Sequence, residues 1–496
     1  MNSTFFGLEL SRRALESQQV ALNIAGHNIA NANTPGYSRQ IANLTTTTPD
    51  PLLVSGRNMS LGSGVTLDTI TRARDAFVDR QVRTETSKQQ YLGGKVDNLT
   101  KVEGIMNEPS DSSLSGNLNS FWTAWSSLAN NPQDTGTRSV VLGQTATLVD
   151  NFHSISTQIS DLQVDINSKV KTQISQINNY ASQIGELNNQ IKRAEAAGDH
   201  PNDLYDSRDN AVDELAKLVN VKVTETPDSN FANGQVSNYK VEIGDPLHSL
   251  VDGAGVNQLV EVTNPSGLGG DGTTGGNDIT TVQWADGTPL FPDKGQGQGA
   301  LGANIETRDT YLTTLQKNYD TLAAGIVTAV NDIYGSGSGS GTGAGSKFFD
   351  DSSTVTASNI TISSSVTANA IVTGTTGVSG DGSIAAAISS LSTGWSSLTD
   401  PDLSNMKANY GTSLGYFYGT TVTQLGVDLQ QATNLKSTED VLVTNATNQR
   451  ESISSVSLDE EMTNLLKFQK SYSAAAKMVT MMDDMLSTIL NMGITK

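Results

Sequence analysis

Both ends of the chain carry apolar side chains at the spacing of a coiled-coil seam. Near the N-terminus one apolar residue recurs every seven positions, at Leu8, Leu15, Leu22 and Ile29. Near the C-terminus the apolar positions are Leu458, Leu465, Phe468, Tyr472, Ala475, Val479, Met482, Leu486 and Ile489. Stripes of this kind have to be buried against another helix. The two ends are therefore expected to pair with each other or with neighbouring subunits.

The interior contains further segments with helical periodicity. Apolar residues three and four apart predict helices over 75–106, 113–130, 138–197, 203–219, 300–334 and 402–449. The pattern over 138–197 is the longest, and at ~1.5 Å per residue it predicts a helix on the order of 80–90 Å long. Such a helix needs helical partners along its apolar stripe. Gly198 is expected to end it, and Asn202 or Asp203 to cap the helix that follows.

Short runs rich in β-branched residues separate these helices. They predict short extended pieces within 41–75 and strands at 221–226, 239–243 and 256–262, bounded by turn-forming residues. A Gly/Ser linker over 335–346 precedes a second β-leaning insert over 347–378. Residues 384–398 fit either a short helix or a strand.

This order of elements predicts a mainly α fold with inserted β domains. Helices come first and last, so both chain ends would form one long helical stalk, with small β-rich domains projecting from it. The expected domains are a terminal coiled-coil domain (1–40 and 455–496), a helical stalk (41–220, 300–335 and 400–454), a β-rich domain (221–299), and the linker with the second β-leaning insert (336–399).

Composition narrows the class of protein. The chain has 496 residues and no cysteine, with 36% hydrophobic and 5% aromatic residues, which is low for a compact enzyme. Its net charge of −20 argues against binding to nucleic acid or to an anionic membrane surface. Residues 1–30 lack the basic start and apolar core of a secretory signal, and no segment has 18 consecutive apolar residues. From composition alone, the chain would be expected to stay in the cytoplasm.

Candidate chemistry is sparse. The four histidines are scattered, and without cysteine they offer no zinc constellation. The acidic run 459–461 precedes the C-terminal helix, where negative charge is favourable at the positive end of the helix dipole. We therefore predict no catalytic residue, no cofactor and no metal site, and expect that the protein is not an enzyme.

The N-terminal stripe ends in a distinctive motif. Its residues are Asn28, Ile29, Ala30, Asn31, Asn33, Thr34, Pro35, Gly36, Tyr37, Ser38, Arg39 and Gln40. Proline forces the residue before it to be extended, and Gly36 can supply the positive φ of a type II turn. The asparagines favour a helix end because their side chains compete for backbone hydrogen bonds. The motif therefore predicts a helix that stops and turns sharply.

The same motif resembles the signature of the flagellar axial proteins, which comprise rod, hook and hook-associated proteins. The continuation from Pro35 to Gln40 is similar to the hook–filament junction proteins of that family. The segment from Ser457 to Glu461, together with Phe468, Tyr472 and Leu486, resembles the family's closing segment. About 40 residues match at each end, and 203–219 match more loosely. The resemblance is specific because both ends must fit, in order, within one chain.

The resemblance implies a structural subunit that joins hook to filament. It implies terminal helices that line an axial tube, and export by the flagellar apparatus to the cell exterior without a cleaved signal. The implied partners are the flagellar hook protein, hook-associated protein 3, copies of the chain itself in a ring, and an export chaperone for the C-terminal region. The predicted assembly interface consists of all residues of the two apolar stripes except Ala475. The motif would fix the direction in which the chain leaves the inner layer of the tube.

Two alternatives remain open at this stage. Another axial protein, a hook or distal rod subunit, would share the N-terminal motif but would explain the continuation Ser38 to Gln40 and the long helices less readily. A secreted adhesin or wall hydrolase would need a pocket with convergent polar groups, and no residue spacing proposes one. Activity on peptidoglycan would distinguish the hydrolase.

The predicted interface leads to a first test. Leu465→Asp places a charge in the C-terminal stripe, where it would have to be buried on assembly. We expect this variant not to assemble on hooks, while far-UV circular dichroism shows that the 75–450 stalk remains folded. Normal assembly of the variant would contradict the pairing of the chain ends.

Overall fold

The computed structural model describes residues 6–54, 57–228, 236–244, 247–264, 279–291, 299–337, 346–394 and 413–494. The chain forms two compact units. Unit 1 consists of Met1–Ser87, Ile177–Gln258 and Glu439–Lys496. Unit 2 consists of Lys88–Gln176 and Leu259–Thr438. Both chain ends belong to unit 1, and helices α2, α4 and α10 contribute residues to both units.

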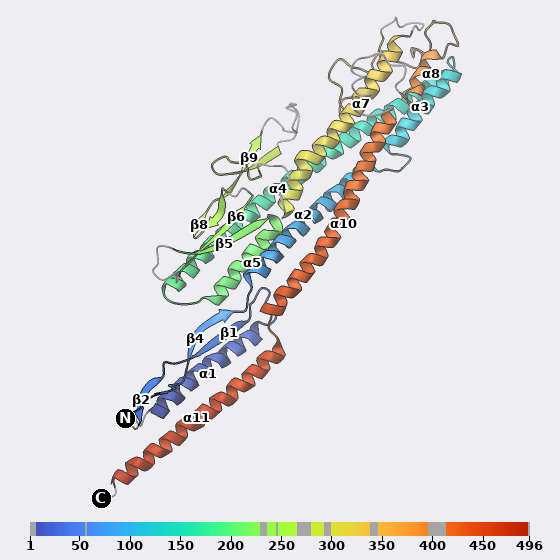
Figure 1. The fold of residues 1–496 in the computed structure, drawn as a ribbon. Coiled ribbons are helices and arrows are strands. Elements are labelled where there is room, and N and C mark those ends of the chain that lie inside the picture. Colours follow the sequence, from blue (N-terminus) through green and yellow to red (C-terminus); the bar gives the residue numbers. More distant parts are fainter. Residues whose placement is uncertain are drawn as a thin grey trace. The chain divides into compact units, whose positions relative to one another are not determined.

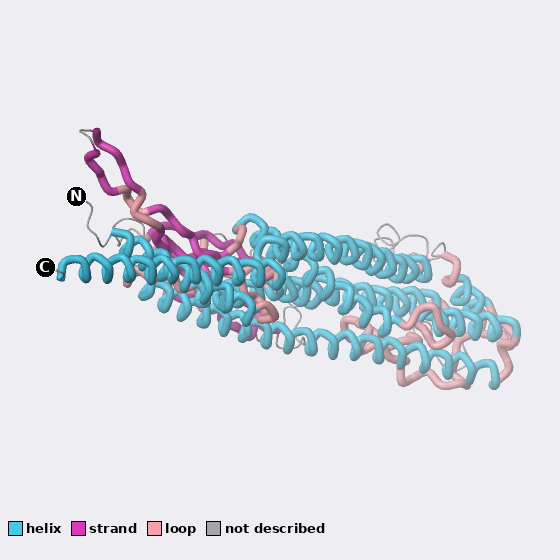
Figure 2. Tube along the Cα trace, turned by 90° about the horizontal axis from the view of Figure 1, so that it is seen from below, coloured by secondary structure: helices cyan, strands magenta, loops and turns pink. Residues whose placement is uncertain are grey.

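Unit 1 is organised around its two terminal helices, α1 (Phe6–Asn31) and α11 (Leu458–Ile494). They lie side by side and run in opposite directions (Figures 1 and 2). After α1 come β1 (Gln40–Thr46), β2 (Asp50–Val54), β3 (Arg57–Leu61) and β4 (Val65–Arg72). β1 pairs with β4 and β2 with β3, both antiparallel, so the segment from Gln40 to Arg72 returns to the end of α1.

The remainder of unit 1 contains a helix and a small sheet. Helix α5 (Asn202–Leu218) follows the second part of α4, and α10 contributes its last turns. The sheet has the strand order β5-β6-β7-β8, formed by β5 (Val221–Pro227), β6 (Ser237–Ile243), β7 (Ser249–Asp252) and β8 (Gly255–Val256). Alternate residues of β6, Tyr239, Val241 and Ile243, are buried. Asn188 on α4 holds the sheet by donating to the Gly253 carbonyl at 2.7 Å.

Unit 2 is a helical bundle with an aromatic core. Its helices are parts of α2 (Ala76–Met106), α4 (Thr135–Ala196) and α10 (Leu414–Ser454), with α3 (Leu114–Asn130), α6 (Gly299–Glu306), α7 (Leu312–Gly335) and α8 (Ser383–Ser390). A hairpin of β9 (Leu259–Asn264) and β10 (Ile279–Trp284) completes the described part. Trp125 packs edge-on against Phe348 with ring centroids 5.1 Å apart, and both side chains are fully buried.

Most predicted helices are confirmed, because their apolar faces continue without a break. The predictions for 75–106, 113–130, 138–197 and 203–219 correspond to α2, α3, α4 and α5. The structure describes 414–449 of the predicted helix 402–449, as part of α10, while 402–412 lie outside the described residues. The short helix within 384–398 is α8. In the part of the chain that the structure describes, no helix is long and apolar enough to cross a membrane.

The helix predicted over 300–334 is confirmed, but it is not α-helical throughout. A π-helical turn, η2 (Thr307–Tyr311), separates α6 from α7. The wider turn brings Arg308 into the core, where its side chain is 1% exposed. Its guanidinium donates to Asn167 Oδ1 at 2.7 Å and to Asp309 Oδ1 at 2.6 Å. A buried guanidinium requires such partners, and the inserted residue of a π turn provides the necessary rotation.

Three further local predictions need correction. The N-cap of α5 is Pro201, and the Asn202 side chain instead donates to the Ile70 carbonyl at 3.0 Å. Residues 256–262 divide between β8 and β9 rather than forming one strand. Residues 347–378 form turns and a single bridge, Phe349 to Ile362, instead of strands. Apolar side chains of this segment pack into the core of unit 2 from turns. The β-branched residues therefore serve core packing and do not indicate strands. The Gly-rich segment 338–345 lies outside the described residues.

The aromatic core yields a stability prediction. All four tryptophans fall within the residue ranges of unit 2, so tryptophan fluorescence reports the unfolding of that unit. Phe348→Ala removes the ring that Trp125 contacts and should lower the free energy of unfolding by about 3–5 kcal/mol in urea titrations. Val140→Ala, at a side chain that is 51% exposed, is the matched control and should stay within about 0.5 kcal/mol. Equal effects would refute the assignment of this core.

Candidate assembly site at the paired chain ends

Two contacts define how α1 and α11 face each other. Near the start of α1, Gly7 lies against the Met482 side chain, so closely that a Cβ on Gly7 would be 2.6 Å from Met482 Cε. Near its end, the Asn28 amide donates to Glu461 Oε2 at 3.2 Å. The two contact residues are three heptads apart on each helix. Both contacts therefore belong to one antiparallel register.

The side of α1 that faces α11 consists mostly of small residues. In step with Gly7 and Asn28, at alternating steps of four and three, come Ser11, Ala14, Gln18, Ala21 and Ala25. Ser11, Ala21 and Ala25 are buried. Small side chains let two helices approach closely, and Met482 on α11 packs against Gly7 at one end of this face. Phe468 and Val479, at apolar heptad positions of α11, are half-buried. Hydrophobic patterning selected the leucines of α1 and missed this face.

The predicted interface residues occupy different environments in the single chain. Leu8, Leu15, Leu22 and Ile29 are half-buried, as are Leu465, Phe468, Val479, Met482 and Leu486 on α11. Leu458, Tyr472 and Ile489 are 49%, 36% and 58% exposed. The pairing of the helices leaves these three side chains largely in solvent. The role of this residue set as an assembly interface stays a prediction.

The axial-protein motif forms a turn closed by one asparagine. Asn28 Oδ1 accepts hydrogen bonds from the Tyr37 hydroxyl at 2.7 Å and from the Gln40 N–H at 2.9 Å. The Asn28 amide also donates to the Gln40 carbonyl at 2.9 Å. Burial raises the pKa of Tyr37, and Asp203, Asp206 and Glu461 add to this, so its hydroxyl remains a donor. The last turn of α1 is thereby joined to the first residue of β1.

The exposed half of the motif carries the change of direction. Asn31 donates to the His27 carbonyl at 3.1 Å and accepts from the Thr34 hydroxyl at 3.2 Å. Gly36 has φ +75°, and a Cβ there would meet the Asn210 side chain of α5. Glycine is therefore required both by conformation and by the close approach of α5. Ala30, Asn33, Thr34 and Pro35 are exposed, with Ile29 half-buried beside them.

Ser38 and Arg39 connect the motif to three other helices. The Ser38 N–H and hydroxyl both donate to Asp206 of α5, at 2.9 and 2.7 Å. Arg39 Nε donates to Glu461 Oε1 at 2.8 Å, and its Nη1 lies 3.2 Å from Glu460 Oε2. The Arg39 N–H donates to the Ser454 carbonyl at the end of α10. Glu460 and Glu461 therefore neutralise Arg39 in addition to lying in the first turn of α11.

A row of carboxylates on α5 receives the guanidinium groups of unit 1. Asp206, Asp209 and Asp213 lie on one face of the helix. Arg72 lies 2.8 Å from both Asp206 and Asp209, and Arg74 lies 3.3 Å from Asp209. Arg83 lies 3.2 Å from Asp209 and 2.6 Å from Asp213. Arg450 lies 2.6 Å from Asp213. These pairs link β4, α2 and α10 to α5. Sequence reasoning missed them; the loose match over 203–219 and the acidic spacing were the available signals.

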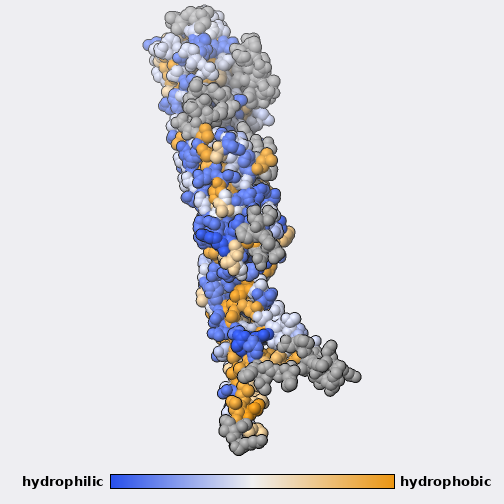
Figure 3. All heavy atoms as spheres, turned by 90° about the vertical axis from the view of Figure 1, so that its left-hand side faces the viewer, coloured by the Kyte–Doolittle hydropathy of each residue, from blue (hydrophilic) through white to orange (hydrophobic). Residues whose placement is uncertain are grey.

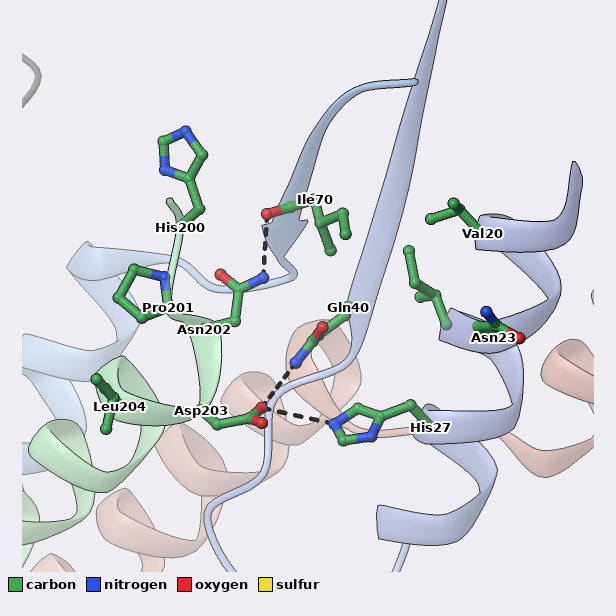
Figure 4. A pocket seen from close by; sticks show the side chains of 11 residues that line it. Val20, Asn23, His27, Gln40, Ile70, His200, Pro201, Asn202, Asp203 and Leu204 are labelled. Carbon is green, nitrogen blue, oxygen red and sulfur yellow. Dashed lines mark hydrogen bonds and ion pairs between the residues drawn. The ribbon is translucent and has the colours of Figure 1, made fainter. Parts of the chain in front are cut away.

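A shallow groove of about 580 Å³ lies beside the motif, between α1, β4 and the start of α5 (Figure 4). Val20, Ile24 and Ile70 contribute its apolar lining. His27 and the Gln40 amide both point toward Asp203, at 3.5 and 2.9 Å, whereas His200 stands apart (Figure 4). Within the described residues there is no cluster of three or more His, Asp or Glu side chains suited to a metal ion.

Comparison with known proteins first identifies the class. Residues 8–37 match the family model "Flagella basal body rod protein", and 448–492 match "Flagellar basal body rod FlgEFG protein C-terminal". The two matches cover most of α1 and α11, together with the first part of the motif. The paired ends thus define a flagellar axial protein.

The interior identifies the particular family. Residues 99–349 match "Flagellar hook-associated protein FlgK helical domain". Flagellar hook-associated protein 1 of Bacillus subtilis is 32% identical over 99% of this chain and 99% of its own length. The protein of that name from Salmonella typhimurium is 32% identical over 70% of this chain and 59% of its own. The chain belongs to the flagellar hook-associated protein 1 family, a family of hook–filament junction proteins that are structural rather than enzymatic.

One solved structure is also similar. The flagellar hook junction protein FlgK from Burkholderia pseudomallei aligns with 25% identity over 55% of this chain and 46% of that chain. Its TM-score of 0.45 is too low to support an argument about the fold.

The carboxylate row yields a pH prediction. Burial alone would raise the pKa of Asp209, but Arg74, Arg83 and Arg72 together hold it well below the ordinary value of 3.8. A lowered pKa in the folded state adds stability that is fully present above about pH 4 and is lost as the pH falls further. Asp209→Asn should cost about 3 kcal/mol at pH 7, because the buried Arg83 and the partly buried Arg72 and Arg74 lose a partner, and should weaken the acid dependence.

Hydrogen exchange of α5 amides measures this directly, since it reports the local free energy of opening. Asp68→Asn, at an exposed position on β4, is the matched control and should leave the exchange unchanged. If the protection of the α5 amides falls equally in both variants, Asp209 is not the origin of this stability. The same holds if the dependence of this protection on acid pH persists in Asp209→Asn.

Proposed function

We propose that this hook–filament junction subunit acts as an adaptor between two assemblies of different mechanics. The hook protein would contact it on one side and hook-associated protein 3 on the other, with copies of the chain forming a ring between them. The observation that carries the proposal is the antiparallel α1–α11 pair, which retains apolar side chains that the single chain does not bury.

These side chains form a strip on α11. Met478, Met481, Met485 and Ile489 follow one another at helical spacing and are 41%, 51%, 51% and 58% exposed. In Figure 3 apolar side chains gather along the part of unit 1 that the terminal helices form. An exposed apolar strip of this length is typical of an interaction surface, and methionine adapts well to neighbours of varied shape. A head-to-tail ring of identical subunits would cover it.

The predicted interface and domains enter the proposal in the same way. The half-buried stripe Leu8, Leu15, Leu22 and Ile29 would complete the contacts between copies, with Leu458, Tyr472 and Ile489 of α11. Residues 1–40 and 455–496 would act as the terminal domain, and the helical residues between them as the stalk. The β-rich domain over 221–299 and the insert over 336–399 would lie outside the ring contacts.

Export and location follow from membership of a flagellar family. As an axial component of the flagellum, the protein is exported from the cell. We propose that it leaves through the flagellar apparatus without a cleaved signal and resides at the hook–filament junction. An export chaperone would bind the C-terminal region before assembly, because α11 carries the exposed methionine strip. Neither nucleic acid nor membrane would take part, given the net charge of −20.

We also propose that the protein has no catalytic activity. The groove beside the motif engages its one carboxylate, Asp203, with His27 and Gln40. Its side chains therefore brace α1 against α5, and a hydrolase would need a nucleophile or a second acid at the same place. Incubation with peptidoglycan is expected to release no fragments.

A deletion strain tests the proposed function. Cells that lack this chain should complete their hooks but shed filament protein into the medium, because the filament has nothing to attach to. Electron microscopy of the cells and immunoblotting of the medium measure both outcomes, and expression of the full chain is the control that restores filaments. Cells without hooks would instead identify a hook or rod subunit. Normal filaments would remove the junction role altogether.

A further inference from the structure

The heptad repeats of α1 and α11 do not by themselves fix the register in which the two helices pair. Apolar and small residues repeat every heptad along both helices, so a shift by seven residues would retain most of the packing. Glu461 breaks this repetition. Its side chain is 3% exposed, although it carries a charge and lies at the interface between the two helices.

Two elements supply the partners of that carboxylate. Asn28 of α1 donates to Oε2 at 3.2 Å, and Arg39, just before β1, donates to Oε1 at 2.8 Å. Each oxygen thus has its own donor. A buried carboxylate is tolerated where such donors are present and is costly elsewhere.

A shifted register would lose these bonds in either direction. Moving α11 by one heptad toward the start of α1 would bring Glu461 opposite Ala21, which is 1% exposed and offers no donor. A shift the other way would bring Phe468 opposite Asn28, whose amide is buried. The first shift takes the donor of α1 away from the buried Glu461 carboxylate, and the second leaves the Asn28 amide with only its bond to the Gln40 carbonyl. The native register keeps all of these bonds.

Arg39 also holds the break between α10 and α11. Its N–H donates to the Ser454 carbonyl at 2.9 Å, and its side chain binds Glu461 and Glu460. Ser454 ends α10, whereas Glu460 and Glu461 lie in the first turn of α11. One residue therefore contacts both sides of the break.

We propose that Asn28, Arg39 and Glu461 form a register lock, in which these three are positioning residues for assembly. The lock selects one alignment of α1 and α11 from several that the apolar repeat allows. It also sets the direction in which α11 leaves α10. The importance of this alignment for joining hook to filament rests on the proposed function, but the lock itself does not.

The absence of cysteine in the chain allows a direct test. Gly7→Cys with Met482→Cys reports the native register on oxidation or with a short cross-linker. Gly7→Cys with Ala475→Cys and Gly7→Cys with Ile489→Cys report shifts by one heptad in each direction. Met482→Ala is included in these two pairs so that Gly7→Cys meets no obstructing side chain. Cross-linking yields are measured on the purified full chain.

The native pair should give the dominant product. Adding Glu461→Gln with Arg39→Gln should raise the shifted products roughly tenfold relative to the native one, because the polar discrimination between registers is lost. Asp459→Asn, at an exposed side chain in the same first turn of α11, is the matched control and should change little. Exchanging the charges, Arg39→Glu with Glu461→Arg, in a Glu460→Gln background re-forms the ion pair without a like charge beside position 39. An arginine at 461 cannot accept from the Asn28 amide, so the native product should recover only in part, which merely destabilising substitutions would not allow.

Equal yields of the three products in the unaltered background, or native yields in the Glu461→Gln, Arg39→Gln background, would overturn the lock. A separate assay of binding to isolated hooks keeps the two proposals apart. Chain that shows the register dependence but does not bind hooks would retain the lock and contradict the proposed junction role. Chain that binds hooks with no register dependence would contradict the lock alone.

Discussion

The structure of unit 1 depends on a constraint of connectivity: its first and last helices must meet. Asn28 and Glu461, which are 433 positions apart in the sequence, bond to each other. Ordering the two ends against one another carries a large loss of conformational entropy, and apolar contacts between small residues and a partly exposed helix recover it only in part. Hydrogen bonds and ion pairs from the motif add the stabilisation that the apolar contacts between α1 and α11 do not provide. The turn after α1 is therefore as much a part of the interface as the helices.

The motif acts through a second layer of charge on α5. Ser38 binds Asp206, which also accepts from Arg72, and Asp209 connects Arg72, Arg74 and Arg83. Such buried ion pairs contribute less to stability than to specificity, because desolvation offsets much of their attraction. Their value here is geometric, since a guanidinium fork bound to two carboxylates tolerates little displacement. The paired ends are thus attached rigidly to the remainder of unit 1.

The sequence predicted most of the helices but little of this layer. Long helices such as α4 and α11 can be recognised from the sequence, because their apolar residues recur at the helical period. The face of α1 toward α11 escaped notice, since Gly7, Ser11 and Ala21 have no hydrophobic signal and the neighbouring leucines do. The π turn before α7 and the missing side-chain cap on α5 were likewise decided by tertiary partners, Asn167 and the Ile70 carbonyl. The ion pairs of α5 join residues that are far apart in sequence, and single-chain patterning cannot pair them.

The distance between the two members of the Asn28–Glu461 contact has a consequence for the order of events during synthesis. Helix α1 leaves the ribosome long before its partner α11 does. Residues 88–438, which contain all of unit 2, emerge before α11 does, so that unit can fold while the seam of α1 has nothing to pack against. Pairing of α1 with α11 therefore occurs only in chains that have been synthesised at least as far as residue 461. A chain truncated between residues 438 and 461 would retain the core of unit 2 yet could not form the Asn28–Glu461 contact.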